Sequence, residues 1–207
     1  MAWKKILIWA LAIAVVAYLA LVVYRIPAVA EKKRTEEAVA RIHAQKLTLD
    51  TVMGKNLPPA PDPVANDATV EGIDANNNGI RDDVELAIHR RYPDSPQVRA
   101  VELQHALSLQ KELTEVFNTP TLIAAIQEEE RAGLCINEIT PKISLDDDPE
   151  YVKKVLAMSD AIEKEVEDWV INSELRKRRY KEIFKYMASY GDLSGQNCDI
   201  NLGELPN

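Results

Sequence analysis

The 207-residue chain contains little glycine, few aromatic side chains and only two cysteines. Glycine occurs 7 times, and Phe, Trp and Tyr together make up 6% of the residues. No alternation of polar and apolar residues extends beyond a few positions, and no internal repeat is present. These absences disfavour a β-sandwich and predict a mainly helical protein. Apolar residues, at 46%, are numerous enough to form a buried core.

The motifs that usually carry catalysis are absent as well. There is no serine elbow between glycines, no phosphate-binding loop, no zinc-protease helix and no cysteine in a reactive signature. His43, His89 and His105 lie far apart along the chain. We interpret them as ordinary helix-surface residues, although His89 and His105 could meet in a helical domain. The sequence therefore predicts no enzyme, and the alternative is an envelope hydrolase whose site no motif reveals.

The N-terminal region lacks acidic residues, and its apolar stretch lacks charge altogether. Residues 6–24 carry no charged side chain, and a helix needs roughly 20 such residues to cross a hydrocarbon layer of about 30 Å. Lys4 and Lys5 precede this stretch, and Arg25 follows it. We interpret residues 1–27 as a signal anchor that contacts the membrane through residues 6–24.

A cleaved secretory signal is the alternative to an anchor. Ala28, Val29 and Ala30 fit the small-residue pattern of a cleavage site, and cleavage near Ala30 would give a secreted protein. The apolar stretch is longer than the ~7–15 residues of a usual signal core, and Arg25 separates it from the site, so we favour the anchor. No cysteine lies nearby, which excludes a bacterial lipoprotein signal.

Acidic residues dominate the remainder of the chain. Beyond residue 30 there are 22 basic and 33 acidic residues, a net charge of −11. A body of this charge repels nucleic acid, and no nucleic-acid-binding module is present, so we expect no nucleic-acid partner. Flanking charge leaves the orientation of the anchor open, because Lys4 and Lys5 favour a cytoplasmic N-terminus whereas Arg25 and the basic run 32–34 favour the opposite.

The two cysteines, Cys135 and Cys198, are an even number that an exported domain can pair. Their pairing would tie an irregular C-terminal tail to the helical body. Two buried free thiols are the alternative. Together with the loop described below, these cysteines favour a body outside the cytoplasmic membrane, in the periplasm.

Beyond the anchor, the chain divides into a stalk, a linker and a domain. Residues 28–54 form the predicted stalk, with a helix over about residues 28–48 that begins after Pro27. Residues 55–72 form a proline-rich linker, either extended or wrapped on the body. Residues 73–207 form an all-α domain, which we expect to be a compact helical bundle.

Start and stop signals place the helices of this domain. A cap residue precedes a proline suited to the first helical position at Ser95–Pro96, Thr119–Pro120 and Asp148–Pro149. A helix over 82–92 is expected to end before Pro93. Ser173 is expected to cap the last helix, and Gly191 to end it. The charged runs 127–131, 145–149 and 176–181 are interpreted as solvated helix faces or caps.

The stretch 72–85, GIDANNNGIRDDVE, combines acidic and amide side chains around one glycine. It matches the pattern D-x-[DN]-x-[DN]-G-x5-E at each specified position. Calcium prefers six to eight oxygen ligands at about 2.3–2.6 Å, and side chains at alternate positions can converge as such a loop curls around its glycine. The expected ligands are Asp74, Asn76, Asn78, Asp82 and Glu85 through side chains, and Ile80 through its carbonyl. An Asn-rich turn that caps a helix is the alternative.

This loop resembles EF-hand calcium loops, and more closely the calcium loops of thrombospondin type 3 and related bacterial extracellular repeats. The longer stretch NLPPAPDPVANDATVEGIDANNNGIRDDVE is similar to a group of uncharacterised bacterial envelope proteins. The resemblance covers about 30 of the 207 residues; it implies calcium binding outside the cytoplasm and no activity. Arg81 stands where an EF-hand has an apolar residue, and no incoming helix or second loop is present, so a paired calcium sensor is not expected.

The sequence thus predicts a single-pass membrane protein whose extracytoplasmic domain holds one structural Ca²⁺ ion at residues 74–85. Because Asn76 and Asn78 replace charged ligands, we expect an affinity of about 10⁻⁴–10⁻³ M. The expected role is interaction or scaffolding with an unknown protein partner in the cell envelope. A calcium-switched binding module is an alternative to a structural ion.

Overall fold

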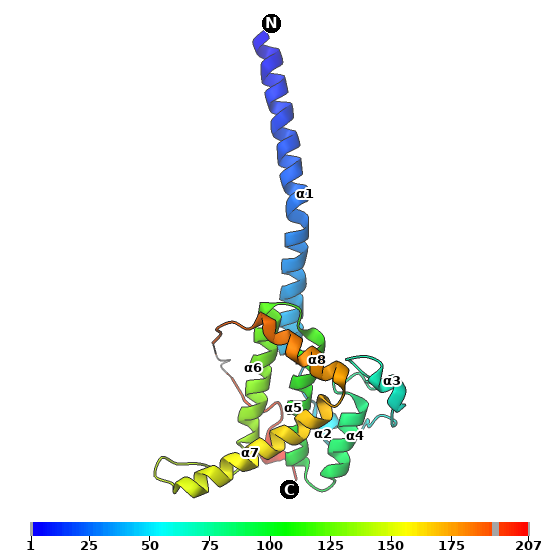
Figure 1. Cartoon of the computed structure of the whole chain (residues 1–207), viewed down its shortest axis with the longest axis vertical. Coiled ribbons are helices and arrows are strands. Elements are labelled where there is room, and N and C mark those ends of the chain that lie inside the picture. The colour runs from blue at the N-terminus through cyan, green and yellow to red at the C-terminus, as the bar shows by residue number, and fades with distance from the viewer. Residues whose placement is uncertain (1, 192–194, 207) are drawn as a thin grey trace. The chain divides into compact units, whose positions relative to one another are not determined.

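The computed structural model describes residues 2–191 and 195–206. Within these ranges the chain forms helices and no strand, which confirms the all-α class (Figure 1). It divides into two compact units, Met1–Ala38 and Val39–Asn207, which are described in turn.

The first unit consists of most of helix α1 (Ala2–Ala44). Among the described residues, α1 is the helix long and apolar enough to cross a membrane, with a mean hydropathy of 2.9 over 18 residues, and a signal sequence has the same character. The helix continues through Pro27, so the predicted helix start after this proline is wrong. Proline lacks one backbone N–H, and α1 accommodates that loss within a single 43-residue helix.

The second unit begins before the end of α1, at Val39. Ile42, Leu47 and Val52 are buried within it. The residues from Val39 to residue 54 are thus part of the folded unit, whereas the sequence analysis assigned them to a stalk. Burial of these apolar side chains in the core stabilises the fold because it removes apolar surface from water, which an exposed stalk would not do.

Most longer helices of the second unit pack against one central helix, α5 (Pro96–Glu115). The bounds of the other elements after α1 are α2 (Leu49–Val52), α3 (Pro63–Asp67), α4 (Asp82–Arg91), α6 (Thr119–Ile136), α7 (Pro149–Val170), α8 (Glu174–Ile183) and the 3₁₀ turns η1 (Phe184–Tyr186) and η2 (Leu202–Glu204). Helix α5 packs against α2, α4, α6, α7 and α8, and most of its residues are buried. That these helices form a compact bundle stays a prediction from the sequence.

Local cap chemistry explains where these helices begin. Asp148 caps α7 by accepting hydrogen bonds from the backbone N–H groups of Glu150 and Tyr151, and Ser173 caps α8 in the predicted manner. At α6 the cap is Asn118, one residue before the predicted Thr119. Helix α8 ends at Ile183, well before the predicted Gly191.

The predicted linker, residues 55–72, is a loop wrapped on the body, held by one buried arginine. Arg176 of α8 has no exposed side-chain surface, and it donates hydrogen bonds to the carbonyl oxygens of Asn66 and Val70 and to Asp67 Oδ1. The expectation that the basic run 176–181 is a solvated face is therefore wrong at Arg176. A guanidinium group offers five donors in a planar fork, which suits it to collecting several carbonyl oxygens of one loop.

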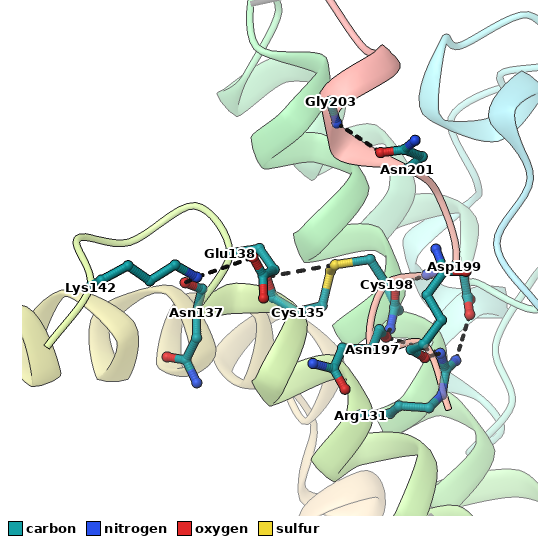
Figure 2. Close-up of a disulfide and its surroundings, with 12 residues drawn as sticks. Arg131, Cys135, Asn137, Glu138, Lys142, Asn197, Cys198, Asp199, Asn201 and Gly203 are labelled. Atoms are coloured by element: carbon teal, nitrogen blue, oxygen red, sulfur yellow. Dashed lines mark hydrogen bonds and ion pairs between the residues drawn. A yellow bond between two sulfur atoms is a disulfide. The ribbon is translucent and has the colours of Figure 1, made fainter. Parts of the chain in front are cut away.

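The C-terminal tail is fastened to α6 by a disulfide. Cys135 and Cys198 are bonded, which confirms the predicted pairing (Figure 2). Arg131, one turn earlier on α6, donates hydrogen bonds to the carbonyl oxygen of Asn197 and to Asp199 Oδ1 (Figure 2). The tail thus follows the surface of the domain through covalent and polar contacts, although it has little regular structure of its own.

Candidate metal-binding loop

The loop of residues 74–85 lies between the wrapped segment and α4. Its turn is made by two residues in the left-handed region, Asn77 with φ 56° and Gly79 with φ 91°. A Cβ atom at Gly79 would lie 2.0 Å from Gln45 Nε2 and 2.8 Å from Leu107 Cδ1. The φ angle favours glycine at position 79, and a side chain there would also displace the ends of Gln45 and Leu107.

The side chains at alternate positions bond to the backbone inside the turn. Asp74 Oδ1 accepts from the N–H of Asn78 at 3.1 Å, and Asp74 Oδ2 accepts from the N–H of Gly79 at 2.8 Å. Asn76 Oδ1 accepts from the N–H of Asn78 at 3.3 Å, and Asn78 Oδ1 accepts from the N–H of Ile80 at 2.8 Å. These bonds curl the chain so that Asp74, Asn76 and Asn78 share the inner side of the loop.

Two buried carboxylates at the start of α4 close the loop. Asp82 and Glu85 are each 1% exposed. Asp82 Oδ1 accepts from the N–H of Ala75 at 3.0 Å, while Asp82 Oδ2 has no hydrogen-bond partner among the described residues. Glu85 Oε2 accepts from Asn76 Nδ2 at 2.9 Å. The start of a helix favours negative charge, which helps both carboxylates to occupy these positions.

The carboxylates of the loop are close enough to affect one another. Burial, and then the charge of Asp74, raises the pKa of Asp82. Burial raises the pKa of Glu85 as well; the hydrogen bond from Asn76 lowers it, and the charges of Asp82 and Asp74 raise it. The loop therefore carries mutual repulsion that a bound cation would remove.

The six predicted ligand residues lie in one loop, but their carboxylates do not form a finished metal site. Within residues 2–191 and 195–206, no group of three or more His, Cys, Asp and Glu side chains is placed to hold a metal ion. The Nδ2 atom of Asn76 faces Glu85, while its Oδ1 atom lies inside the turn. The chemistry of the donor set, three carboxylates and two amides, fits a hard cation.

Arg81, which departs from the EF-hand pattern, fixes the loop to a distant helix. It is 1% exposed, and it donates from Nη1 to the carbonyl oxygen of Val170 at 3.0 Å and from Nη2 to that of Trp169 at 2.7 Å. Asp83 pairs with its Nε. The C-terminal end of a helix such as α7 favours a positive charge. The sequence shows only that Arg81 is an unusual residue at this position, and its partners lie almost 90 positions away.

The three histidines contact different groups in the described part of the chain. His105 of α5 is 5% exposed, and burial lowers its pKa to about 4, so the expectation of a helix-surface residue is wrong there. His89 Nε2 lies 3.1 Å from the carbonyl oxygen of Thr51, and His43 Nδ1 lies 2.9 Å from Glu128 Oε1. The three rings therefore have separate environments.

Acidic residues outside the loop are buried as well, and for the run 127–131 this contradicts the expected solvated face at Glu128. Glu128, in the run 127–131, is 3% exposed and pairs with Lys46 and Arg131. Glu112 of α5 is fully buried, and burial, followed by the charge of Glu129 on α6, raises its pKa well above the ordinary value. Both side chains are buried because α5, which carries Glu112, packs against α6, which carries Glu128.

No protein-family model matches the chain, and neither a curated protein nor a solved structure matches it. The likeness of residues 74–85 to extracellular calcium loops therefore rests on the residues themselves.

Proposed function

We propose that residues 74–85 bind one Ca²⁺ ion, which stabilises the extracytoplasmic domain of a membrane-anchored envelope protein. The observation that carries this proposal is Asp82 Oδ2, a carboxylate oxygen to which no residue of the described part of the chain donates, in a side chain that is 1% exposed. An unpaired buried carboxylate oxygen is costly, and a hard divalent cation is the partner that would satisfy it. The neighbouring charges of Asp74 and Glu85 would be neutralised by the same ion.

The ion would complete a site that the loop has partly organised. The side chains of Asp74, Asn76, Asn78, Asp82 and Glu85 supply oxygens, together with the carbonyl of Ile80. Because Asn76 and Asn78 are neutral, the affinity is expected to be about 10⁻⁴–10⁻³ M, in the range of extracellular modules. An ion there links the wrapped segment to α4, and through Arg81 to α7, so its role is structural and the helical domain stays compact around it.

The location is supported by two further features. Helix α1 has the length and composition of a membrane span. The Cys135–Cys198 disulfide is a bond that persists in oxidising compartments such as the periplasm. The proposed topology places the domain in the periplasm, and cleavage near Ala30 would release the same domain.

An interaction or scaffolding role fits the apolar surface around the start of α7. Ile143, Leu145 and Leu156 are exposed, Leu145 completely. Exposed apolar side chains of this kind, close to one another in sequence, are typical of surfaces that bind other proteins.

The rival role, an envelope hydrolase, needs an acid or base that a substrate can reach. Glu102 and Glu112 have strongly raised pKa values but no exposed surface, so they do not support it.

Isothermal titration calorimetry tests the proposal: calcium is added to the full-length protein in detergent micelles. We expect saturable heat with a dissociation constant of about 10⁻⁴–10⁻³ M, and a melting temperature that rises with calcium because the ligand binds only the folded state. Asp74→Ala and Glu85→Ala should abolish both effects.

Asp94→Asn is the matched control, because it removes one negative charge from an exposed position just beyond the other end of α4. It should leave the titration unchanged. Absence of heat from the unaltered protein, or equal loss of heat in the control, would reject the calcium site. A large change in circular dichroism on binding would favour the calcium-switched module over a structural ion.

A further inference from the structure

The loop of residues 74–85 contacts the segment that follows α1. Gln45, the first residue after α1, donates a hydrogen bond from Nε2 to the carbonyl oxygen of Asn78 at 3.4 Å. The carbonyl oxygen of Asn56 accepts a hydrogen bond from Asn76 Nδ2 at 3.0 Å. We call residues 45–56 the junction segment, and the loop bonds to it at both ends.

A cleft of about 420 Å³ separates the loop from the junction segment between these two contacts. Its lining includes Gln45, Thr51 and Asn56 from the junction segment and Asn76, Asn78 and Glu85 from the loop. Three of the proposed calcium ligands therefore face the junction segment directly. Any rearrangement of those side chains changes the wall of this cleft.

The middle of the junction segment is held by other parts of the domain. The N–H of Leu47 donates to Asp199 Oδ2 at 2.8 Å, and the carbonyl oxygen of Val52 accepts from Arg99 Nε at 3.0 Å. Leu47 and Val52 are both buried. The ends of the segment bond to the loop, whereas its middle bonds to the tail and to α5 and packs in the core cluster that also contains Ile80.

Contact at the first end is tight. The backbone of Gly79 approaches Gln45 so closely that a Cβ atom there would lie 2.0 Å from Gln45 Nε2. Gln45 therefore packs against the turn of the loop as well as bonding to Asn78.

We propose that calcium binding at the loop orders the two ends of the junction segment, through which α1 continues into the domain. This inference rests on the proposed calcium site. Without a cation, repulsion among Asp74, Asp82 and Glu85 opposes the loop geometry that places the Asn78 carbonyl and the Asn76 amide. With the cation those groups are fixed, and Gln45 and Asn56 gain permanent partners.

The inference is tested by hydrogen exchange of the full-length protein in micelles, measured by mass spectrometry. Exchange is compared in excess calcium and in EGTA. We expect calcium to slow exchange at residues 45–46 and 53–57 about tenfold, which corresponds to about 1.4 kcal/mol of local stability. Exchange at residues 47–52 should change little, because contacts outside the loop hold them.

Gln45→Ala should bind calcium with unchanged heat, because Gln45 is not a proposed ligand. In this variant calcium should no longer slow hydrogen exchange at residues 45–46 but should still slow it at residues 53–57. Gln97→Ala is the matched control: it removes a similar bond, from Gln97 Nε2 to the carbonyl oxygen of Leu202, and should keep both effects. Calcium heat without any slowing would overturn the inference and leave the calcium site standing. A response in Gln45→Ala equal to that of the unaltered protein would overturn it too. Absence of heat would overturn both.

Discussion

The charge pattern of the sequence does not show which ionisable side chains are buried. Glu102 of α5 is fully buried, and neither of its carboxylate oxygens has a hydrogen-bond partner among the described residues. Burial, and then the charge of Glu165 on α7, raises the pKa of Glu102 to about 8. Arg91 lies near enough to lower that pKa, but it does not offset the burial. Glu102 therefore retains a proton near neutral pH.

Replacement of Glu102 by glutamine should reduce the dependence of stability on pH. The pKa in the folded protein, about 8, lies above the ordinary value of 4.5. Between these values the folded protein binds a proton that the unfolded chain releases, so this group's contribution falls as the pH rises from about 4.5 to about 8. We expect Glu102→Gln to stabilise the protein by about 1–3 kcal/mol at pH 8 and to change little at pH 4.5.

Melting temperatures measured across this pH range provide the check. Glu138→Gln, which alters an exposed carboxylate paired with Lys142, is the control and should keep the slope of the unaltered protein. An identical slope for Glu102→Gln and the control would show that Glu102 is already ionised below neutral pH.

Among the helices, α8 shows how one element can have both a solvated and a buried face. Its basic run includes the exposed Lys177 and Arg178, together with the fully buried Arg176. Arg179 donates to the carbonyl oxygens of Leu113 and Val116 at the end of α5. Helix α8 therefore fastens both the wrapped loop and the C-terminal end of α5 through arginines.

Arg176→Lys should loosen the wrapped loop of residues 55–72. Lysine keeps the charge but loses the planar fork that reaches several carbonyl oxygens at once. We expect a loss of about 2 kcal/mol in stability and faster cleavage of this loop by thermolysin, mapped by mass spectrometry. Arg178→Lys on the exposed face should change neither quantity, and equal cleavage in both variants would contradict the role of Arg176.

Across the whole domain, the tail joins regions that are far apart in sequence. Asp199 accepts hydrogen bonds from the N–H of Leu47 and from Arg131, while its own N–H donates to Gln104 Oε1. The adjacent Cys198 is bonded to Cys135, 63 positions earlier. One short stretch thus connects the junction segment, α5 and α6.

Loss of the disulfide should weaken the domain as a whole. In the chain-entropy treatment, closing a loop of this length lowers the entropy of the unfolded chain. This stabilises the folded state by about 4 kcal/mol. We expect the double variant Cys135→Ser, Cys198→Ser to melt at a markedly lower temperature. A reducing agent should lower the melting temperature of the unaltered protein and leave that of the double variant as it is. If reduction has no effect on the unaltered protein, the disulfide does not contribute to its stability.

The sequence alone determined the features that depend on neighbouring residues. A proline at the first helical position marks the starts of α5 and α7, because it costs no hydrogen bond there, and Ser173 marks the start of α8 by capping it. The charge-free run 6–24 fixes the apolar character of α1. The order of Asp74, Asn76, Asn78 and Gly79 fixes the turn of the candidate loop, since each side chain bonds to the backbone a few positions ahead.

Tertiary structure alone decided which charges are buried and what the loop contacts. Arg81, Glu128 and Arg176 look like surface residues in the sequence, but their partners lie on other elements tens of positions away. The bond between Gln45 and Asn78 likewise spans 33 positions. Such pairings follow from how the helices pack around α5. Burial then sets the pKa and the hydrogen-bond partners of each group, which no local pattern contains.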